Sequence, residues 1–127
     1  MVRVLIVDDD PVIRRLLQVN FRLADFEVDV AGGGEEALSI MASARPDIVV
    51  MDVTMPDVDG FQVVRRMRED DRLRDVHVVI LSARSSDADQ AAAEQLGAAA
   101  YLTKPFDPAE LIDIVREATA DIGGAAG

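Results

Sequence analysis

Five polar residues of this chain stand where short apolar runs end, and their types suit phosphoryl chemistry. Asp8 and Asp9 follow the first apolar run, Asp52 and Ser82 follow two later runs, and Lys104 follows the last. Three carboxylates beside a single lysine leave an excess of negative charge, which raises a carboxylate pKa or is offset by a bound cation. Oxygen ligands in a chain with one histidine and no cysteine favour Mg²⁺ that keeps several of its waters.

Together these groups predict a nucleophilic carboxylate. A metal-bound carboxylate beside an ammonium group and a hydroxyl can attack a phosphoryl group, while Mg²⁺, Lys104 and Ser82 stabilise the equatorial oxygens. The product is an aspartyl phosphate. Taken singly, an aspartate at a strand end is usually a turn or cap residue, and a lone lysine is usually a solvated charge. The shared position at the ends of four apolar runs favours the functional interpretation.

The elements that must position these residues are repeated strand–helix units. Runs rich in valine and isoleucine alternate with segments of helical period, which is typical of a parallel sheet with helices around it. Strands are expected at 3–7, 27–31, 47–51, 77–81 and 99–102. The first, third and fourth are the most apolar and should be buried on both faces. In such a sheet the ligand site lies beyond the carboxyl ends of the strands, where all five polar residues fall.

The first and fourth helices are expected to differ in how firmly they are held. Asp10 is a plausible N-cap for the first helix, and Ile13, Leu16, Leu17 and Asn20 follow at helical spacing as its inner face. The fourth helix, near 87–96, offers an inner face of small residues: Ala88, Ala91 and Ala92, with Leu96. We expect it to bury little apolar area and to be held less firmly than the others.

Composition limits the classes of protein to which the chain can belong. At 127 residues one domain is expected, and 13 basic against 24 acidic residues give a net charge of −11, which disfavours direct binding to nucleic acid or to anionic membranes. The lack of cysteine excludes disulfides and thiolate zinc sites, and the single histidine, His77, excludes multi-histidine metal clusters. No apolar stretch approaches the roughly 18 residues of a membrane span. We expect a soluble, cytoplasmic protein.

Three segments closely resemble the receiver domain of bacterial two-component response regulators. They are VLIVDDD at 4–10, DIVVMDVTMPDVDG at 47–60 and YLTKPF at 101–106, in this order and with Ser82 between the last two. The resemblance covers residues 1–120 and leaves 121–127 as a flexible tail or a truncated linker. It implies an α/β fold of the flavodoxin-like (βα)5 type, with five parallel strands in the order 2-1-3-4-5 and helices on both faces.

The resemblance also implies roles for individual residues. Asp52 would be the phosphoryl acceptor, and Mg²⁺ would be held by Asp8, Asp9, Asp52 and the backbone carbonyl of Thr54. Lys104 would contact the phosphoryl group.

A second set of implied roles concerns the switch between states. Ser82 would be the switch hydroxyl, and Tyr101 its aromatic partner, which moves inward when the hydroxyl is drawn to the phosphate. Thr54 and Arg84 occupy positions that the family leaves variable and that flank the path of the hydrolytic water. The bond from Lys104 to Pro105 would be cis, an arrangement found almost only at proline.

By the same resemblance the chain is a signalling domain rather than an enzyme, catalysing only its own phosphorylation and dephosphorylation. It would take a phosphoryl group from a histidine kinase or phosphotransfer protein. It would then control a downstream protein or an attached output domain through the fourth helix, the fifth strand and the fifth helix, with no direct contact to nucleic acid or membrane.

Alternative functions share parts of this pattern. Asp8, Asp10 and Val12 match the D-x-D-x-[TV] pattern of haloacid-dehalogenase phosphatases, but those enzymes generally need a longer chain, and the match leaves Asp52 without a role. A flavodoxin-like flavin carrier is disfavoured because the loop after the first strand is acidic and would repel the flavin phosphate. A receiver-like interaction module that works without phosphorylation remains open.

Overall fold

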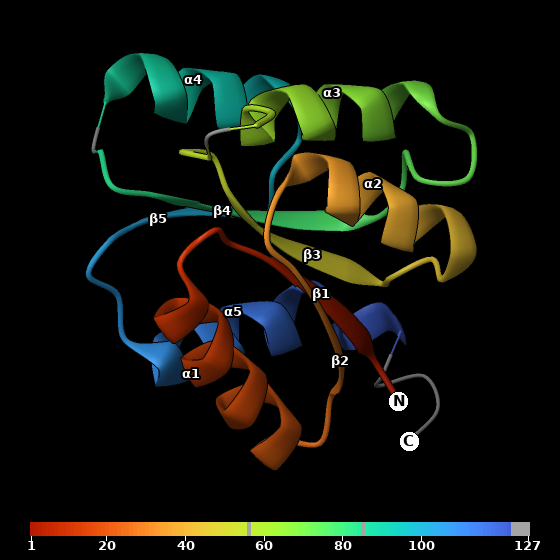
Figure 1. Cartoon of the computed structure of the whole chain (residues 1–127), viewed down its shortest axis with the longest axis vertical. Helices are drawn as coiled ribbons and strands as arrows, with labels where there is room; N and C mark the ends of the chain where they lie inside the picture. Colours follow the sequence, from red (N-terminus) through yellow and green to blue (C-terminus); the bar gives the residue numbers. More distant parts are fainter. Residues whose placement is uncertain (56, 85, 123–127) are drawn as a thin grey trace.

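Apolar runs and helical segments alternate as the sequence predicts, and the runs form a parallel sheet with helices on both faces (Figure 1). The computed structural model describes residues 1–55, 57–84 and 86–122. The strands are β1 (Arg3–Val7), β2 (Glu27–Ala31), β3 (Ile48–Asp52), β4 (His77–Ser82) and β5 (Ala100–Thr103). The helices are α1 (Pro11–Leu23), α2 (Gly34–Ser43), α3 (Gly60–Glu69), α4 (Asp87–Gln95) and α5 (Pro108–Ala118). Helices α1 and α5 cover one face of the sheet, and α2, α3 and α4 cover the other (Figure 1).

The strand order is β2-β1-β3-β4-β5, and every neighbouring pair is parallel, which confirms the expected fold class. The central strands β1, β3 and β4 are buried almost throughout, whereas the edge strands β2 and β5 are largely half-exposed. The last three strands end one residue later than the sequence predicted. As a result Asp52 and Ser82 are the final residues of their strands, at the carboxyl edge of the sheet.

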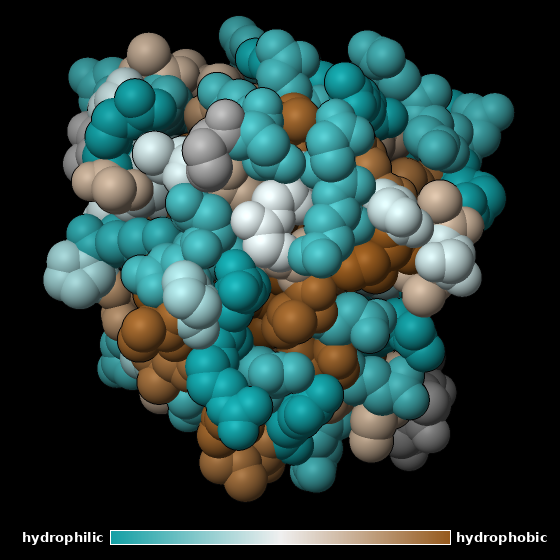
Figure 2. All heavy atoms as spheres, viewed as in Figure 1, coloured by the Kyte–Doolittle hydropathy of each residue, from teal (hydrophilic) through white to brown (hydrophobic). Residues whose placement is uncertain are grey.

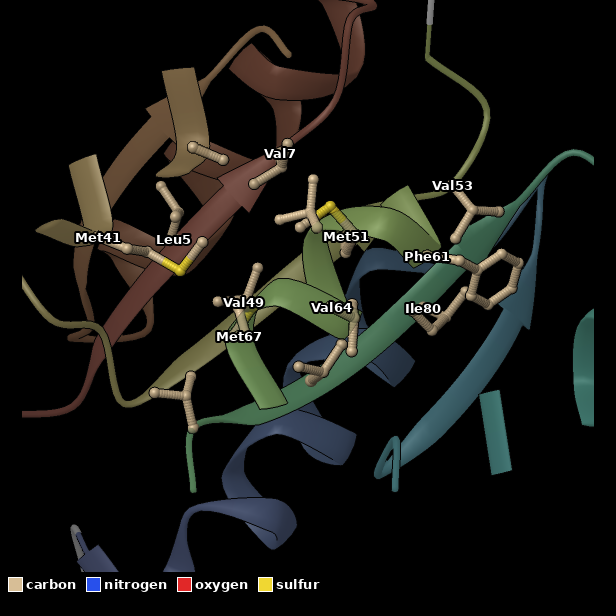
Figure 3. Packing of buried hydrophobic residues seen from close by; sticks show 14 of the residues in the cluster. Leu5, Val7, Met41, Val49, Met51, Val53, Phe61, Val64, Met67 and Ile80 are labelled. Carbon is tan, nitrogen blue, oxygen red and sulfur yellow. The ribbon is translucent and has the colours of Figure 1, made fainter. Parts of the chain in front are cut away.

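Two apolar layers hold the helices against the sheet. Alternate residues of the central strands point to opposite faces, so that Leu5 and Val49 join the layer under α2 and α3, while their neighbours join the layer under α1 and α5. Figure 3 shows Val64 and Met67 of α3 packed in the first of these layers. Helix α3 is therefore firmly anchored, with five buried residues.

Helix α1 begins as predicted, and its predicted inner face is confirmed at Ile13 and Leu17 but not at Leu16. The Asp10 carboxylate accepts a hydrogen bond from the Val12 amide at 2.9 Å and caps the helix. The buried residues are Leu17 and Phe21, and Leu16, expected inside, is 45% exposed. The correction follows from geometry, since Leu16 lies about 100° around the helix from Leu17 and Phe21 lies one turn beyond Leu17 on the same side.

Helix α4 is also rotated relative to the prediction. Ala93 is its buried residue, Ala92 and Asp89 are half-buried, and Ala88 and Ala91, expected inside, are exposed. A run of alanines does not define a face by its apolar pattern, which is why the predicted inward face of α4 was wrong. The expectation that α4 buries little apolar area is confirmed. None of the helices in the described part of the chain is long and apolar enough to cross a membrane.

Gly60 allows α3 to begin against the end of β3. A Cβ added at this position would lie 2.5 Å from the Asp52 carbonyl oxygen and 2.7 Å from the Val53 Cα. The Gly60 amide also donates to the Val53 carbonyl at 3.4 Å. A side chain here would have to displace main chain that belongs to the carboxyl edge of the sheet.

We expect Gly60→Ala to lower the free energy of unfolding by about 1–3 kcal/mol, the usual cost of forcing extra volume into a packed site. Urea unfolding followed by circular dichroism measures it. Gly32→Ala is the matched control, because its added Cβ would meet the end of the flexible Arg14 side chain, at 3.0 Å, and should cost little. Equal stability of the two variants would show that α3 can shift away from β3.

Candidate functional site

The five polar residues singled out from the sequence converge at the carboxyl edge of the sheet. Asp8 and Asp9 follow β1, Asp52 ends β3, Ser82 ends β4 and Lys104 follows β5. The parallel pairing of β1 with β3 and of β3 with β4 places these strand ends side by side. The sheet thus positions the groups with main-chain hydrogen bonds rather than through a mobile loop.

Three carboxylates form an acidic cluster. Oxygens of Asp8, Asp9 and Asp52 all lie within 4.8 Å of one another, with Asp8 and Asp52 buried and Asp9 exposed. Buried carboxylates packed this closely need positive charge to offset them. The cluster offers hard oxygen ligands from two strand ends with an open side at Asp9, which fits Mg²⁺ that keeps part of its water shell.

Lys104 neutralises part of this charge. Its Nζ donates to Asp8 Oδ2 at 2.9 Å and lies 3.5 Å from Asp52 Oδ2. Burial alone would lower the pKa of Lys104, but the hydrogen bond to Asp8 and the charges of both aspartates raise it above its ordinary value. The lysine therefore stays protonated and keeps a positive charge beside Asp52. The Lys104–Pro105 peptide bond is cis, as expected.

Asp52 is the carboxylate whose environment is most unusual. It is 1% exposed, and burial raises its pKa to about 6. That value also includes the charges of Asp8 and Asp9, which raise the pKa, and a hydrogen bond from the Thr54 amide, at 3.0 Å, and the charge of Lys104, which lower it. A buried, poorly solvated carboxylate with a cation beside it is suited to nucleophilic attack on an anionic group. The part of the Thr54 carbonyl as a metal ligand stays a prediction.

Ser82 and Tyr101, the expected switch pair, are joined through a third residue. Ser82 is buried, and its Oγ accepts a hydrogen bond from the Arg84 amide at 3.0 Å. The Tyr101 hydroxyl donates to the Arg84 carbonyl at 2.7 Å. Tyr101 is half-buried, with its ring against the apolar layer under α3 and α4. The main chain of Arg84 therefore links the hydroxyl at the site to the aromatic ring on β5.

Two supporting residues were missed by the sequence analysis. The Arg14 guanidinium of α1 donates to the Asp8 carbonyl at 2.9 Å. Asp57, in the loop after β3, accepts hydrogen bonds from the Gly34 and Glu35 amides at 3.2 and 3.3 Å, and so caps α2 from a distant part of the chain. A hydrogen bond from the Val58 amide lowers the pKa of Asp57 most, and the two from α2 lower it further. Both contacts join residues of different structural elements, and no local sequence motif predicts them.

Two other polar residues, Asp10 and His77, make structural contacts. Asp10 caps α1, and its amide donates to Asp8 Oδ1 at 2.9 Å. His77 begins β4 at the opposite edge of the sheet, where its Nε2 lies 3.8 Å from Asp121. The placement of Asp10 agrees with the cap that the sequence predicted.

Comparison with known proteins identifies the class of this arrangement. A model of the response regulator receiver domain matches residues 4–116. The transcriptional regulatory protein PrrA of Mycobacterium leprae is 46% identical over 114 residues, covering 90% of this chain and 48% of that protein. The DNA-binding dual master transcriptional regulator RpaA of Synechocystis is 39% identical over 116 residues, covering 91% of this chain and 48% of that protein. The chain thus spans about half the length of these curated relatives.

Solved structures agree with the sequence comparison. The chemotaxis protein CheY4 of Vibrio cholerae matches with a TM-score of 0.87 and 32% identity, covering 92% of this chain and 98% of that one. A putative response regulator from Chloroflexus aurantiacus matches with a TM-score of 0.86 and 35% identity, covering 93% of this chain and 97% of that one. These findings favour a receiver over the phosphatase and flavin-carrier alternatives.

The raised pKa of Asp52 makes stability depend on pH. The native carboxyl holds its proton up to about pH 6, whereas an unfolded aspartate loses it near pH 3.9. The native state therefore binds more protons between these values, and stability falls as pH rises through that window. Without divalent cations, Asp52→Asn should be more stable than wild type by about 2 kcal/mol at neutral pH.

Urea unfolding in EDTA at several pH values between about 4 and 8 tests this expectation. The stability difference between Asp52→Asn and wild type should shrink as the pH falls toward 4, because Asp52 is then protonated in the native wild type. Asp57→Asn is the control, since Asp57 is exposed and its pKa shifts in the opposite direction. A stability difference between Asp52→Asn and wild type that stays constant across this pH range would contradict the raised pKa of Asp52.

Proposed function

Because the chain belongs to the family of response regulator receiver domains, we propose that Asp52 is its phosphoryl acceptor and that the chain signals by changing conformation when Asp52 is phosphorylated. The observation that carries this proposal is the Asp52 carboxylate, 1% exposed, with Lys104 Nζ at 3.5 Å and two further carboxylates within 4.8 Å. A structural turn residue needs no such surroundings.

In the proposed step a carboxylate oxygen of Asp52 attacks the phosphorus of a phosphohistidine or of acetyl phosphate. The new O–P bond forms as the N–P or O–P bond of the donor breaks, and the imidazole or acetate leaves with the electron pair. Lys104 supplies positive charge where the equatorial oxygens gather, and the Ser82 hydroxyl can donate to one of them. Mg²⁺, held by Asp8, Asp9, Asp52 and the Thr54 carbonyl, would offset the charge of the incoming phosphoryl group.

Loss of the group by hydrolysis would return the domain to its first state, so that the chain catalyses only its own phosphorylation and dephosphorylation. Thr54 and Arg84 are both exposed and lie two residues beyond Asp52 and Ser82. We propose that these two side chains flank the path of the hydrolytic water and set the lifetime of the phosphate.

The output surface is proposed to comprise α4, β5 and α5. A pocket between α4 and β5 is lined by Gln90, Ala93, Tyr101 and Thr103, among others, which puts the switch aromatic in its wall. Residues 1–120 would form the receiver, and 121–127 a tail or linker to an output domain, of which 123–127 lie outside the described residues. The surface of α4, β5 and α5 would contact either such an output domain or a separate downstream protein.

The phosphodonor is proposed to dock on α1, next to the site. Val12, Leu16, Val19 and Leu23 are all more than 40% exposed, at the i, i+4, i+7, i+11 spacing of one helix face. Figure 2 shows hydrophobic surface in the lower part of the view, where α1 lies in Figure 1. Leu16 also borders a pocket with Lys104, so this face is continuous with the site.

Charge indicates the kind of partner that fits α1. The helix carries Arg14, Arg15 and Arg22 and no acidic residue, in a chain whose net charge is −11. Two copies of α1 placed face to face would bring like charges together. A helix of a histidine kinase or phosphotransfer protein with an apolar stripe and acidic flanks would be complementary.

We expect wild-type protein incubated with acetyl phosphate and Mg²⁺ to gain the mass of one phosphoryl group, and Asp52→Asn to gain none. Intact-mass spectrometry measures it. Excess EDTA should abolish the gain, because Asp8 and Asp9 then have no cation to offset their charge. Full labelling of Asp52→Asn would overturn the assignment of the acceptor, whereas an unlabelled wild type would favour a module that works without phosphorylation.

If the phosphodonor protein docks on α1, a substitution there should slow transfer from a histidine kinase without affecting labelling by acetyl phosphate. Leu16→Asp should slow transfer from a phosphorylated histidine kinase at least about tenfold, since a charge replaces a contact at the centre of the apolar face. Labelling by acetyl phosphate should be unchanged, because that donor needs no docking surface. Ile122→Asp, which alters an exposed apolar residue away from α1, is the control. Equal kinase transfer by both variants would show that the donor docks elsewhere.

A further inference from the structure

Two arginines contact helix α4, one near each of its ends. Its buried residue is a single alanine, Ala93, whereas α3 buries five residues. Small apolar contacts of this kind cannot fix the position of a helix strongly. The polar contacts at its two ends therefore decide where α4 lies, and these contacts differ in kind.

At the carboxyl end the contact is made to main chain alone. The Arg68 guanidinium donates to the Leu96 carbonyl at 2.8 Å and to the Gly97 carbonyl at 3.5 Å, directly after α4. It also donates to the carbonyls of Arg74 and Val76, at 2.9 and 2.7 Å, in the loop before β4. One partly buried side chain thus ties α3, two loops and the end of α4 together. None of these acceptors belongs to the phosphoryl site.

At the amino end the contact runs to the site. Arg84 Nη2 lies 3.1 Å from Asp89 Oδ2, and the two atoms form an ion pair without the alignment of a hydrogen bond. The Asp89 side chain is only 18% exposed. Among the described residues Asp89 Oδ2 has no hydrogen-bond partner, so the ion pair is what offsets its charge. The helix cap does not depend on this side chain, because the Ser86 hydroxyl accepts from the Asp89 amide at 3.2 Å.

The same arginine holds both switch residues through its main chain. Its amide donates to Ser82 Oγ and its carbonyl accepts from the Tyr101 hydroxyl. If Ser82 turns toward a phosphoryl group on Asp52, the bond from the Arg84 amide is lost. The segment that carries the Arg84 side chain is then free to shift relative to Asp89.

We propose that Arg84 is a positioning residue that couples the phosphoryl site to α4 through its ion pair with Asp89. Phosphorylation releases the amino end of α4, while Arg68 holds the carboxyl end as a pivot. The proposal rests on the proposed function, because the release begins with a phosphoryl group at Asp52. It adds a specific route from the site to the output surface, through a charge on α4 that the sequence analysis did not consider.

Hydrogen–deuterium exchange of α4 amides, with and without acetyl phosphate and Mg²⁺, tests the proposal on the whole chain. In unphosphorylated protein, Asp89→Asn should speed exchange at residues 89–92 by about two- to fivefold, the range of a partly exposed ion pair. Phosphorylation should produce that increase in wild type and add little in the variant. Exchange at 96–98 should stay unchanged throughout, as expected for a fixed pivot.

Matched variants separate the ion pair from other effects of the substitution. Asp87→Asn removes the same charge from the same first turn and should behave as wild type. Arg84→Ala should match Asp89→Asn, the double variant should go no further, and Arg84→Lys should retain most of the wild-type behaviour. A full phosphorylation response in Asp89→Asn would overturn the proposal.

Intact mass recorded on the same samples keeps the two proposals apart. Wild-type protein that takes up no phosphoryl group would contradict the proposed function. Phosphorylated protein in which α4 exchange does not depend on Asp89 would contradict the coupling alone.

Discussion

The concentration of negative charge at a buried sheet edge is the constraint on which this structure depends. Asp8 and Asp52 lie at 0% and 1% exposure with Asp9 beside them, and the described part of the chain brings one lysine to them. Such a site is costly to fold, because charge removed from water must be compensated by partners. The compensation left incomplete by Lys104 is what a divalent cation can supply, so the cost of burying these carboxylates and their affinity for metal have the same cause.

That constraint explains why the supporting contacts hold main-chain atoms in place. Gly60 lets α3 begin against the Asp52 carbonyl, and Arg14 holds the Asp8 carbonyl from α1. Asp57 ties the loop after β3 to the start of α2. Each contact fixes a strand end from a different helix. Carboxylates held in this way can neither move into water nor separate, so burial first, and repulsion from Asp8 and Asp9 second, keeps the pKa of Asp52 near 6 rather than at the value of a free aspartate.

Sequence patterns predicted the parts of the molecule that repeat or that carry distinctive motifs. Apolar runs gave the five strands within one residue at either end, and the motifs around Asp52 and Lys104 gave the site. Patterns failed where several faces are equally apolar, as on α4, where Asp89 rather than Ala88 turns inward. They also failed for arginines such as Arg68, whose acceptors are carbonyls far along the chain. Every residue has a main-chain carbonyl, so the sequence does not indicate which carbonyls accept these hydrogen bonds.

The difference between α3 and α4 supports the proposal that a signal from this site leaves through α4. Displacing α3 would expose side chains such as Phe61 and Met67, at about 1.5–3 kcal/mol each. A new phosphoryl group forms only about one to three charge-assisted hydrogen bonds and so has a few kcal/mol to redistribute. That amount is too small to move α3 but exceeds what a helix with one buried alanine and a surface ion pair can resist. The alanines that made the inward face of α4 hard to predict are therefore also what would let the helix move when Asp52 is phosphorylated.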